Sequence, residues 1–287
     1  MLKLIRKIIK IKIICFFLFV SIYGCASTPS QPILDLSINP GKVRLLKFQI
    51  PSEWDSSQLE CGSKEAYYFK KEETYIAYIS ESYFSKRKEF DCELVKGKQT
   101  LKVATVKVEE FDYPKEVLHV DKKRVLLSAK DLLRARNDTK ILNKIFSHPV
   151  KSPYFQKEFI LPINSIITSQ FGTQRVFNKV RKGQHLGTDF RAAVGEKIKN
   201  VNDGKVSFKG RFFFGGNTII VDHGAGIFSI YSHLKKFLVK KGEMVKRGQI
   251  IALSGKTGRV SGPHLHWGVK VMGNSVDAMS LLDAGLL

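Results

Sequence analysis

The sequence predicts a mainly β protein with one helical segment. Residues 41 to 120 contain short runs rich in β-branched and aromatic residues, such as TYIAYIS from Thr74 to Ser80. Between Val239 and Ile251, glycines and apolar residues recur with a period of three, as expected for turns between short strands. Apolar residues at helical spacing follow Ser128 and predict a helix that stops before Pro149. A chain of 287 residues is long enough for about two domains.

The first 24 residues resemble a bacterial lipoprotein signal peptide. Five basic residues precede or border the apolar run Ile13–Val20, which is shorter than the ~20 residues of a membrane span. The segment SIYGC then resembles a lipobox and predicts lipidation of Cys25 as the first residue of the mature protein. Because Tyr23 is bulkier than this pattern prefers, an uncleaved signal anchor is the alternative.

The chain is strongly basic. Lys and Arg number 48 against 26 Asp and Glu, a formal net charge of +22. Such a balance is typical of nucleic-acid binders and of proteins that work beside polyanionic envelope polymers. Export disfavours the nucleic-acid interpretation, so we expect no nucleic-acid partner. A solvated basic surface without any partner remains the alternative.

Residues 25–40 are rich in Ser, Pro and small polar residues and predict a tether. Residues 41–120 predict a small β-sandwich, because Leu46, Phe48 and Ile50 alternate along one face of a strand. In the run from Leu101 to Val108 the apolar residues change parity, which indicates a bulge or two buried faces.

Cys61 and Cys92 are the cysteines of this predicted sandwich. In an exported chain we expect them to form a disulfide, worth about 3–4 kcal/mol for a loop of this size. Two free buried thiols are the alternative.

Residues 121–158 predict a helical connector to the C-terminal part. Ser128 followed by Asp131 three residues later resembles a capping box and marks the helix start.

Histidines in the last third carry the clearest chemical signal. His264 and His266 flank one residue, so on a strand they share a face about 7 Å apart. His185 and Asp189 would lie about 13 Å apart on a flat strand, so the chain must bend, and Gly187 permits that bend. Two histidine nitrogens and one carboxylate oxygen suit zinc, and three protein ligands leave a fourth position for water.

These segments resemble the lysostaphin/LytM-type zinc metallopeptidases, which cut peptide bonds in bacterial peptidoglycan. The resemblance covers residues 159–287 and rests on HLGTD, DHG, YSHL and GPHLHWGV in this order. It implies an antiparallel β-sheet catalytic domain of the duplicated hybrid motif type. It also implies one zinc ion per domain, with His185, Asp189 and His266 as ligands and His233 and His264 as catalytic histidines.

Other residues carry weaker signals. Arg175 and Asn217 match family positions near the cleft, with packing in the cleft wall as an equal alternative. His223 in VDHG is expected to be structural. The segment SGKTG from Ser254 fails the phosphate-loop spacing, because Gly248 lies two positions too early, which excludes a nucleotide site of that type.

The expected function is zinc-dependent endopeptidase cleavage of peptide cross-links in peptidoglycan. The chain contains no HExxH motif, so a histidine must act as the base. The alternatives are a non-catalytic LytM domain that activates a cell-wall amidase, and a peptidase acting on exported proteins. The expected location is the cell envelope, lipid-anchored on the periplasmic side of the outer membrane or at the cell surface. The expected partners are peptidoglycan, the membrane through the lipid, and a cell-wall or divisome protein.

Overall fold

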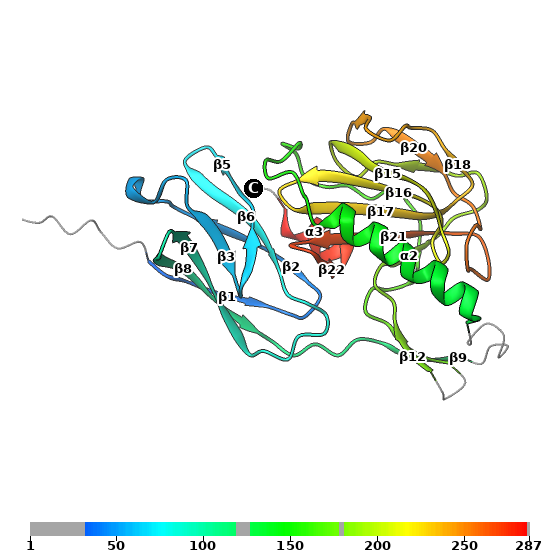
Figure 1. The fold of residues 1–287 in the computed structure, drawn as a ribbon, viewed down its shortest axis with the longest axis horizontal. Helices are drawn as coiled ribbons and strands as arrows, with labels where there is room; N and C mark the ends of the chain where they lie inside the picture. Colours follow the sequence, from blue (N-terminus) through cyan, green and yellow to red (C-terminus); the bar gives the residue numbers. More distant parts are fainter. Residues whose placement is uncertain (1–31, 119–126, 178–180, 286–287) are drawn as a thin grey trace, which may run out of the picture. The chain divides into compact units, whose positions relative to one another are not determined.

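The computed structural model describes residues 32–118, 127–177 and 181–285, and its fold is mainly β, as predicted (Figure 1). Residues Pro32–Leu287 form one compact unit. Among the described residues, no helix combines the length and apolarity needed to cross a membrane. The predicted signal peptide and Cys25 lie outside the described residues.

Two sheets form the first β region. A five-stranded sheet has the strand order β1-β8-β7-β3-β4, and a three-stranded sheet has the order β2-β6-β5. Their strands are β1 (Leu34–Ile38), β2 (Val43–Phe48), β3 (Gln58–Cys61), β4 (Lys64–Ala66), β5 (Tyr68–Lys71), β6 (Thr74–Ser80), β7 (Glu89–Lys96) and β8 (Gln99–Val108). The short 3-10 helix η1 (Ser52–Trp54) precedes β3. The predicted strand TYIAYIS is β6.

The segment predicted as a tether contains β1. Leu34–Ile38 pairs in parallel with β8, Ile38 is buried, and Leu34 and Leu36 pack against the core. The tether was expected from the surrounding Ser and Pro residues, whereas the alternating Leu34, Leu36 and Ile38 make this part a strand.

A bulge interrupts the pairing of β7 with β8. Cys92 pairs with Ala104 and Glu93 with Lys102, so Val103 is the extra residue. Val103 and Ala104 are both buried. This confirms the bulge predicted from the change of parity between Leu101 and Val108.

A disulfide joins Cys61 to Cys92 at directly facing positions of β3 and β7. Both cysteines are buried, so the bond ties two neighbouring strands inside the core of the first β region.

Helix α2 (Ala129–Phe146) begins where the capping pattern predicted, because the Ser128 hydroxyl accepts a hydrogen bond of 3.1 Å from the Asp131 N–H. Its last two turns pack Leu142, Ile145 and Phe146 against a small apolar cluster on β15 to β17. The first turns are less covered, because Leu132 and Leu133 are 44% and 60% exposed.

The C-terminal part is built on an eight-stranded sheet in the order β10-β13-β21-β17-β16-β15-β19, with β22 on β21. Its strands are β10 (Ile167–Ser169), β13 (Thr188–Arg191), β15 (Gly204–Phe212), β16 (Gly216–Gly224), β17 (Ile227–Leu234), β19 (Met244–Val245), β21 (His264–Val271) and β22 (Asn274–Val276). Two small sheets flank it, formed by β12 (Arg181–Gln184), β11 (Gln174–Phe177) and β9 (Lys115–Leu118), and by β14 (Lys197–Lys199), β20 (Ile250–Leu253) and β18 (Lys236–Phe237). Helix α3 (Ala278–Ala284) ends the described chain.

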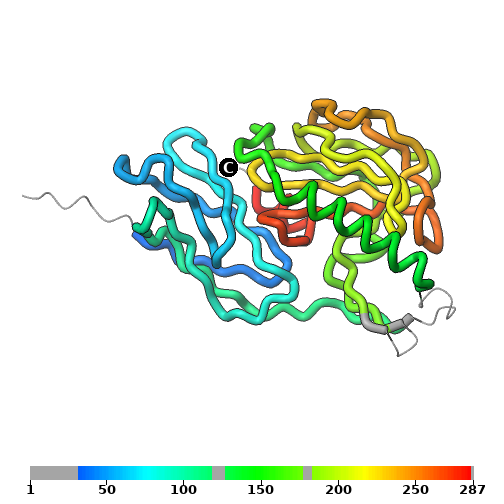
Figure 2. Tube along the Cα trace, in the orientation of Figure 1, coloured from blue at the N-terminus to red at the C-terminus, as the bar shows by residue number. Residues whose placement is uncertain are grey.

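The first β region and the eight-stranded sheet share one apolar core. The Tyr78 ring packs against both Phe155 and Phe159, and its hydroxyl donates a 2.7 Å hydrogen bond to the Gly285 carbonyl. Strand β2 and helix α3, which come from opposite ends of the described chain, lie side by side (Figure 2). There Lys42 pairs with Asp277 at 2.6 Å.

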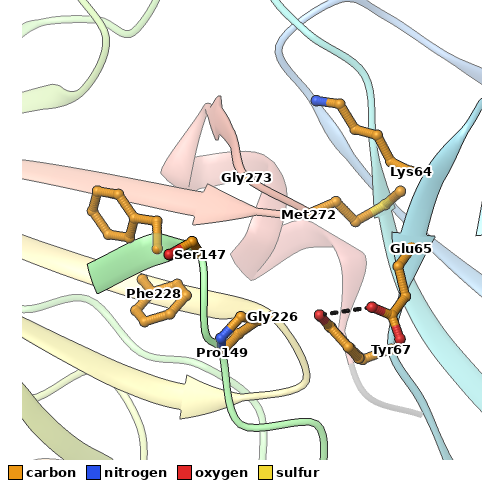
Figure 3. Close-up of a pocket in the computed structure, with 10 residues that line it drawn as sticks. Lys64, Glu65, Tyr67, Ser147, Pro149, Gly226, Phe228, Met272 and Gly273 are labelled. Carbon is orange, nitrogen blue, oxygen red and sulfur yellow. Dashed lines mark hydrogen bonds between the residues drawn. The ribbon is translucent and has the colours of Figure 1, made fainter. Parts of the chain in front are cut away.

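A pocket of about 360 Å³ also lies at this junction (Figure 3). Its lining residues are Lys64, Glu65, Tyr67, Phe146, Ser147, Pro149, Gly226, Phe228, Met272 and Gly273. Inside it, the Tyr67 hydroxyl donates to Glu65 over 3.1 Å. The histidines singled out from the sequence do not line it, so the candidate chemistry lies elsewhere.

Candidate metal centre

Strand β21 places His264 and His266 as the sequence predicted, on one face of the sheet. It lies between β13 and β17, and its antiparallel pairing with β13 sets Asp189 directly opposite His266. Directly opposite residues in an antiparallel pair point to the same side of the sheet. The register of two neighbouring strands therefore brings together ligands that are 77 residues apart.

His185 reaches the same point from the end of β12, and Gly187 separates it from β13. The predicted bend is present, but Gly187 is needed for a different reason than the one expected. The His266 imidazole packs against the Cα of Gly187, so a Cβ at this position would overlap the ring. Gly187 does not have a left-handed φ, and its missing side chain leaves room for the His266 ring.

Three donor atoms converge in this arrangement. His185 Nε2 lies 3.0 Å from Asp189 Oδ1 and 3.1 Å from His266 Nδ1. His266 Nδ1 lies 2.9 Å from Asp189 Oδ1. Among the residues with described coordinates, these three side chains form the His, Cys, Asp and Glu group with the spacing of a metal site.

The imidazole orientation of His185 is set by the backbone. Its Nδ1 lies 3.1 Å from the Gln170 carbonyl and 3.3 Å from the Ser169 hydroxyl. Because a carbonyl oxygen can only accept, Nδ1 carries the proton and Nε2 presents a lone pair to the cluster.

His233 and His264 lie beside the three converging residues. The rings of His233 and His264 are 4.7 Å apart, and those of His233 and His266 are 5.9 Å apart. His264 Nε2 is 3.7 Å from Asp189 Oδ1. The structure therefore brings together all five residues that the sequence singled out for the site.

Backbone carbonyls also fix these two histidines. His233 Nδ1 faces the Thr257 carbonyl at 2.9 Å, and His264 Nδ1 faces the Gly262 carbonyl at 3.0 Å. In both rings the proton is therefore on Nδ1, and Nε2 is free to accept a proton. His233 holds this position with a φ of +63°, a conformation that is costly for a residue with a side chain and that recurs at functional sites.

Burial and close contacts shift the pKa values of three groups in the cluster. Burial opposes ionisation of Asp189, but the adjacent His185 and His266 outweigh it and hold the pKa of Asp189 well below its usual range. Burial, helped by the nearby His266, lowers the pKa of His233 to about 3. Burial also lowers the pKa of His266, against the opposing effect of Asp189.

The donor set fits a divalent cation. Metal bonds of 2.0–2.1 Å in a tetrahedral site place neighbouring donor atoms roughly 3.3 Å apart, close to the spacing found here. Three lone-pair atoms that face one another at 2.9–3.1 Å repel unless a cation or a proton lies among them. The side chains of His264 and His266 are 20% and 23% exposed, so the cluster is open to solvent on that side.

Sequence reasoning missed several residues that shape this site. The carbonyls of Gln170, Thr257 and Gly262 orient imidazoles, and no side-chain pattern marks such a role. Ser169 and Glu116 were not singled out either. Ser169 accepts a hydrogen bond from Arg175, and Glu116 forms an ion pair with Arg175.

The residues with weaker sequence signals are Arg175, Asn217 and His223. Arg175 lies beside Asp189, with Nη2 3.9 Å from Oδ2. Asn217 contributes its backbone N–H, which donates to the Thr257 hydroxyl over 2.9 Å. This bond helps to hold Thr257, whose carbonyl accepts from His233 Nδ1. His223 is fully buried away from the cluster and bonds to the Asp203 carbonyl and the Ser229 hydroxyl.

Comparisons with known proteins agree with this geometry. The sequence matches the model of peptidase family M23 over residues 183–278. The peptidoglycan DD-endopeptidases ShyB and ShyA of Vibrio cholerae are 45% and 42% identical to this chain over 114 residues. These alignments cover 39% of this chain and only 27% and 26% of the two relatives.

The fold has a solved counterpart over most of its length. A crystal structure of a candidate M23 peptidase from Pseudomonas aeruginosa superposes with a TM-score of 0.68 and 24% identity, covering 85% of this chain and 95% of that one. At this identity the likeness shows that the two proteins share a fold.

Proposed function

Residues 183–278 form a peptidase family M23 domain of the LytM/lysostaphin type, and from this premise we propose that the protein is a zinc-dependent endopeptidase that cleaves peptide cross-links of peptidoglycan. The observation that carries the proposal is the convergence of His185 Nε2, Asp189 Oδ1 and His266 Nδ1 within 3.1 Å of one another. Two further imidazoles, those of His233 and His264, lie beside them.

The substrate class is taken from the two Vibrio cholerae relatives, which are named peptidoglycan DD-endopeptidases. We propose the same bond type for this chain, a D,D-peptide bond in a cross-link. The basic net charge of +22 supports this choice, because envelope polymers are anionic and attract a basic surface in a salt-dependent way.

His185, Asp189 and His266 would hold zinc. Zinc suits this set of two imidazoles and one carboxylate, and when bound it supplies Lewis acidity and lowers the pKa of water toward 7. The Nδ1–H bond of His185 to the Gln170 carbonyl fixes the ring, and such outer contacts are the usual support of metal-ligating histidines.

His264 is proposed as the general base. Its Nδ1 donates to the Gly262 carbonyl, so Nε2 offers a lone pair at the open side of the cluster. It would take a proton from the attacking water and later pass it to the leaving amine. General acid–base help of this kind is worth roughly 10²–10⁴-fold in rate.

His233 is proposed to orient the attacking water. A histidine at this place can either hold the attacking water or donate to the developing oxyanion. The Nδ1–H bond to the Thr257 carbonyl leaves Nε2 as an acceptor, and the lowered pKa of His233 disfavours a second proton. An acceptor can hold a water but cannot donate to an oxyanion, which favours the first role.

The envelope location and the lipid anchor at Cys25 stay proposals from the sequence. They fit an enzyme that acts on peptidoglycan, since a lipid anchor would hold it next to its polymer. The metal cluster lies in the C-terminal part, more than 150 residues after Cys25 in the chain.

Incubation of the purified protein with intact sacculi tests the proposal. We expect loss of dimeric muropeptides, gain of monomers, inhibition by a zinc chelator and no action on casein. The matched control is Asp189→Ala, which lacks one proposed ligand. If the protein cleaves casein and leaves sacculi uncut, its substrate is a protein. If it stimulates a separate amidase and forms no endopeptidase product, it is an activator.

A further inference from the structure

Arg175 on β11 contacts both sides of the metal cluster, and we propose that it is a positioning residue for the ligands Asp189 and His185, held in place by Glu116 on β9. This inference rests on the proposed function only where activity is measured. Its main readout is the affinity for zinc, which does not depend on which bond the protein cuts.

The first contact is with Asp189. Of the two carboxylate oxygens, Oδ1 faces the imidazoles of His185 and His266, while Oδ2 lies 3.9 Å from Arg175 Nη2. A carboxylate that binds a metal through one oxygen can turn about its bond to Cβ. A cation in ion-pair range of the second oxygen opposes that turn and keeps Oδ1 directed at the metal position.

The second contact reaches His185 through Ser169. Arg175 Nη2 donates a 2.6 Å hydrogen bond to the Ser169 hydroxyl oxygen, which lies 3.3 Å from His185 Nδ1. The same guanidinium nitrogen is therefore linked to one ligand directly and to another through a single hydroxyl. A hydroxyl oxygen has two lone pairs, so Ser169 can accept from both neighbours.

Glu116 supplies the third contact. Strand β9 pairs in parallel with β11 so that Glu116 stands beside Arg175, and Glu116 Oε2 lies 3.4 Å from Arg175 Nε. The two side chains are 41% and 25% exposed, so the pair adds little to stability. Its effect is electrostatic, because Glu116 balances a guanidinium charge that would otherwise repel the bound cation.

This arrangement makes the segment before the C-terminal sheet part of the site. Strand β9 follows the first β region in the chain, yet it forms the outer strand of the sheet that ends at His185. The M23 match begins at residue 183, so Glu116 and Arg175 both lie before it.

Zinc affinity, measured by competition with a chromophoric chelator, tests the inference. We expect Arg175→Ala to weaken zinc binding by roughly 10–100-fold, the usual cost of losing an outer contact of a metal ligand. Arg175→Lys should lose less, since it keeps the charge but not the fork of donors. Arg191→Ala is the matched control. Arg191 is an exposed arginine on β13, opposite His264 of β21, and the zinc affinity of this variant should not fall.

Exchanging the charges of Arg175 and Glu116 tells whether Arg175 positions the metal ligands or only forms a structural ion pair. Glu116→Arg should repel Arg175 and weaken zinc binding like Arg175→Ala. The double variant Arg175→Glu with Glu116→Arg restores the pair between β9 and β11 but sets a carboxylate against Asp189. Because the pair adds little to stability, we expect the thermal stability of the double variant to stay close to that of the wild type, while its zinc affinity does not recover. Recovery of zinc affinity by the double variant would overturn the inference.

Kinetics on sacculi at saturating zinc give a second readout. Arg175→Ala should lower kcat with little change in KM, because the residue acts on the ligands and not on the substrate. Unchanged zinc affinity with a raised KM would make Arg175 a substrate contact and overturn the inference. If the wild type binds zinc tightly and cleaves nothing, the proposed function fails while the affinity measurements still decide this inference.

Discussion

Asp189 Oδ1 lies 2.9 Å from His266 Nδ1, across a pair of directly facing residues on β13 and β21. The contact follows from the register of the central sheet, because directly opposite residues place their side chains next to each other. A register set by a buried face is strongly specified, because a slip of one residue would turn every side chain to the opposite face. The Asp189–His266 half of the candidate metal site is therefore held by the sheet itself.

Ligand and base substitutions should separate metal binding from turnover. We expect His185→Ala and Asp189→Ala to lose both zinc and hydrolysis, since each removes one of three converging donors. His264→Ala should keep the zinc and lose roughly 10²–10⁴-fold in kcat, because it is assigned proton transfer and no coordination bond. Metal analysis of the purified variants with sacculus digestion checks this. A zinc-free His264→Ala would contradict the assignment.

Stability should fall at mildly acidic pH through His223. Burial lowers the pKa of His223 from 6.5 to about 4, so between these values the unfolded chain binds a proton that the folded chain does not. Stability is therefore complete above pH 6.5 and is lost as the pH falls toward 4, by about 3 kcal/mol in total.

Urea unfolding of the wild type and of His223→Asn at several pH values checks this expectation. The variant should be less stable at pH 7.5, because it loses hydrogen bonds to Asp203 and Ser229. It should also show a shallower slope, by up to about 1.4 kcal/mol per pH unit. Equal slopes for the two proteins would show that His223 is not the titrating group.

Breaking the disulfide should destabilise the whole fold. The bond closes a loop with a sequence separation of 31, for which the chain-entropy relation gives about 3–4 kcal/mol. Cys61→Ala with Cys92→Ala should lower the melting temperature, and a reductant should lower that of the wild type similarly. If reductant left the melting temperature of the wild type unchanged, the disulfide would not stabilise the fold.

The shared core predicts that residues 32–285 unfold together. Tyr78→Ala should cost about 3–5 kcal/mol and lower the stability of both β regions, because the ring packs against Phe155 and Phe159 in the core that the two regions share. Tyr78→Phe, which loses only the bond to Gly285, should cost about 1 kcal/mol. Denaturation followed by intrinsic fluorescence and by zinc release should give coincident transitions. Two separate transitions would show independent domains.

Local patterns in the sequence were enough to predict much of the fold. Strand β6, the bulge at Val103 and the Ser128 cap depend on neighbours within a few residues, so periodicity and capping chemistry reveal them. The five clustered residues were predicted from motif spacing together with a family resemblance. The motif could name His185 and Asp189, but only the pairing of β13 with β21 explains how they meet His266.

The remaining features depend on contacts between distant segments. Nothing near Glu116 indicates that β9 will pair with β11 and face Arg175. The role of the Thr257 and Gly262 carbonyls as acceptors cannot be read from a sequence, because every residue carries a carbonyl. The exposure of Leu132 and Leu133 on α2 has a related cause, since helical spacing shows which residues share a face but not whether another element covers it.

The close packing of Gly187 beneath the His266 ring limits what a list of ligands can reveal. One added methyl group at this position would displace the imidazole while leaving His185, Asp189, His233, His264 and His266 all present in the sequence. A homologue could thus read as catalytically complete and yet be inert. Surveys that sort active enzymes from silent scaffolds should score this glycine alongside the coordinating residues.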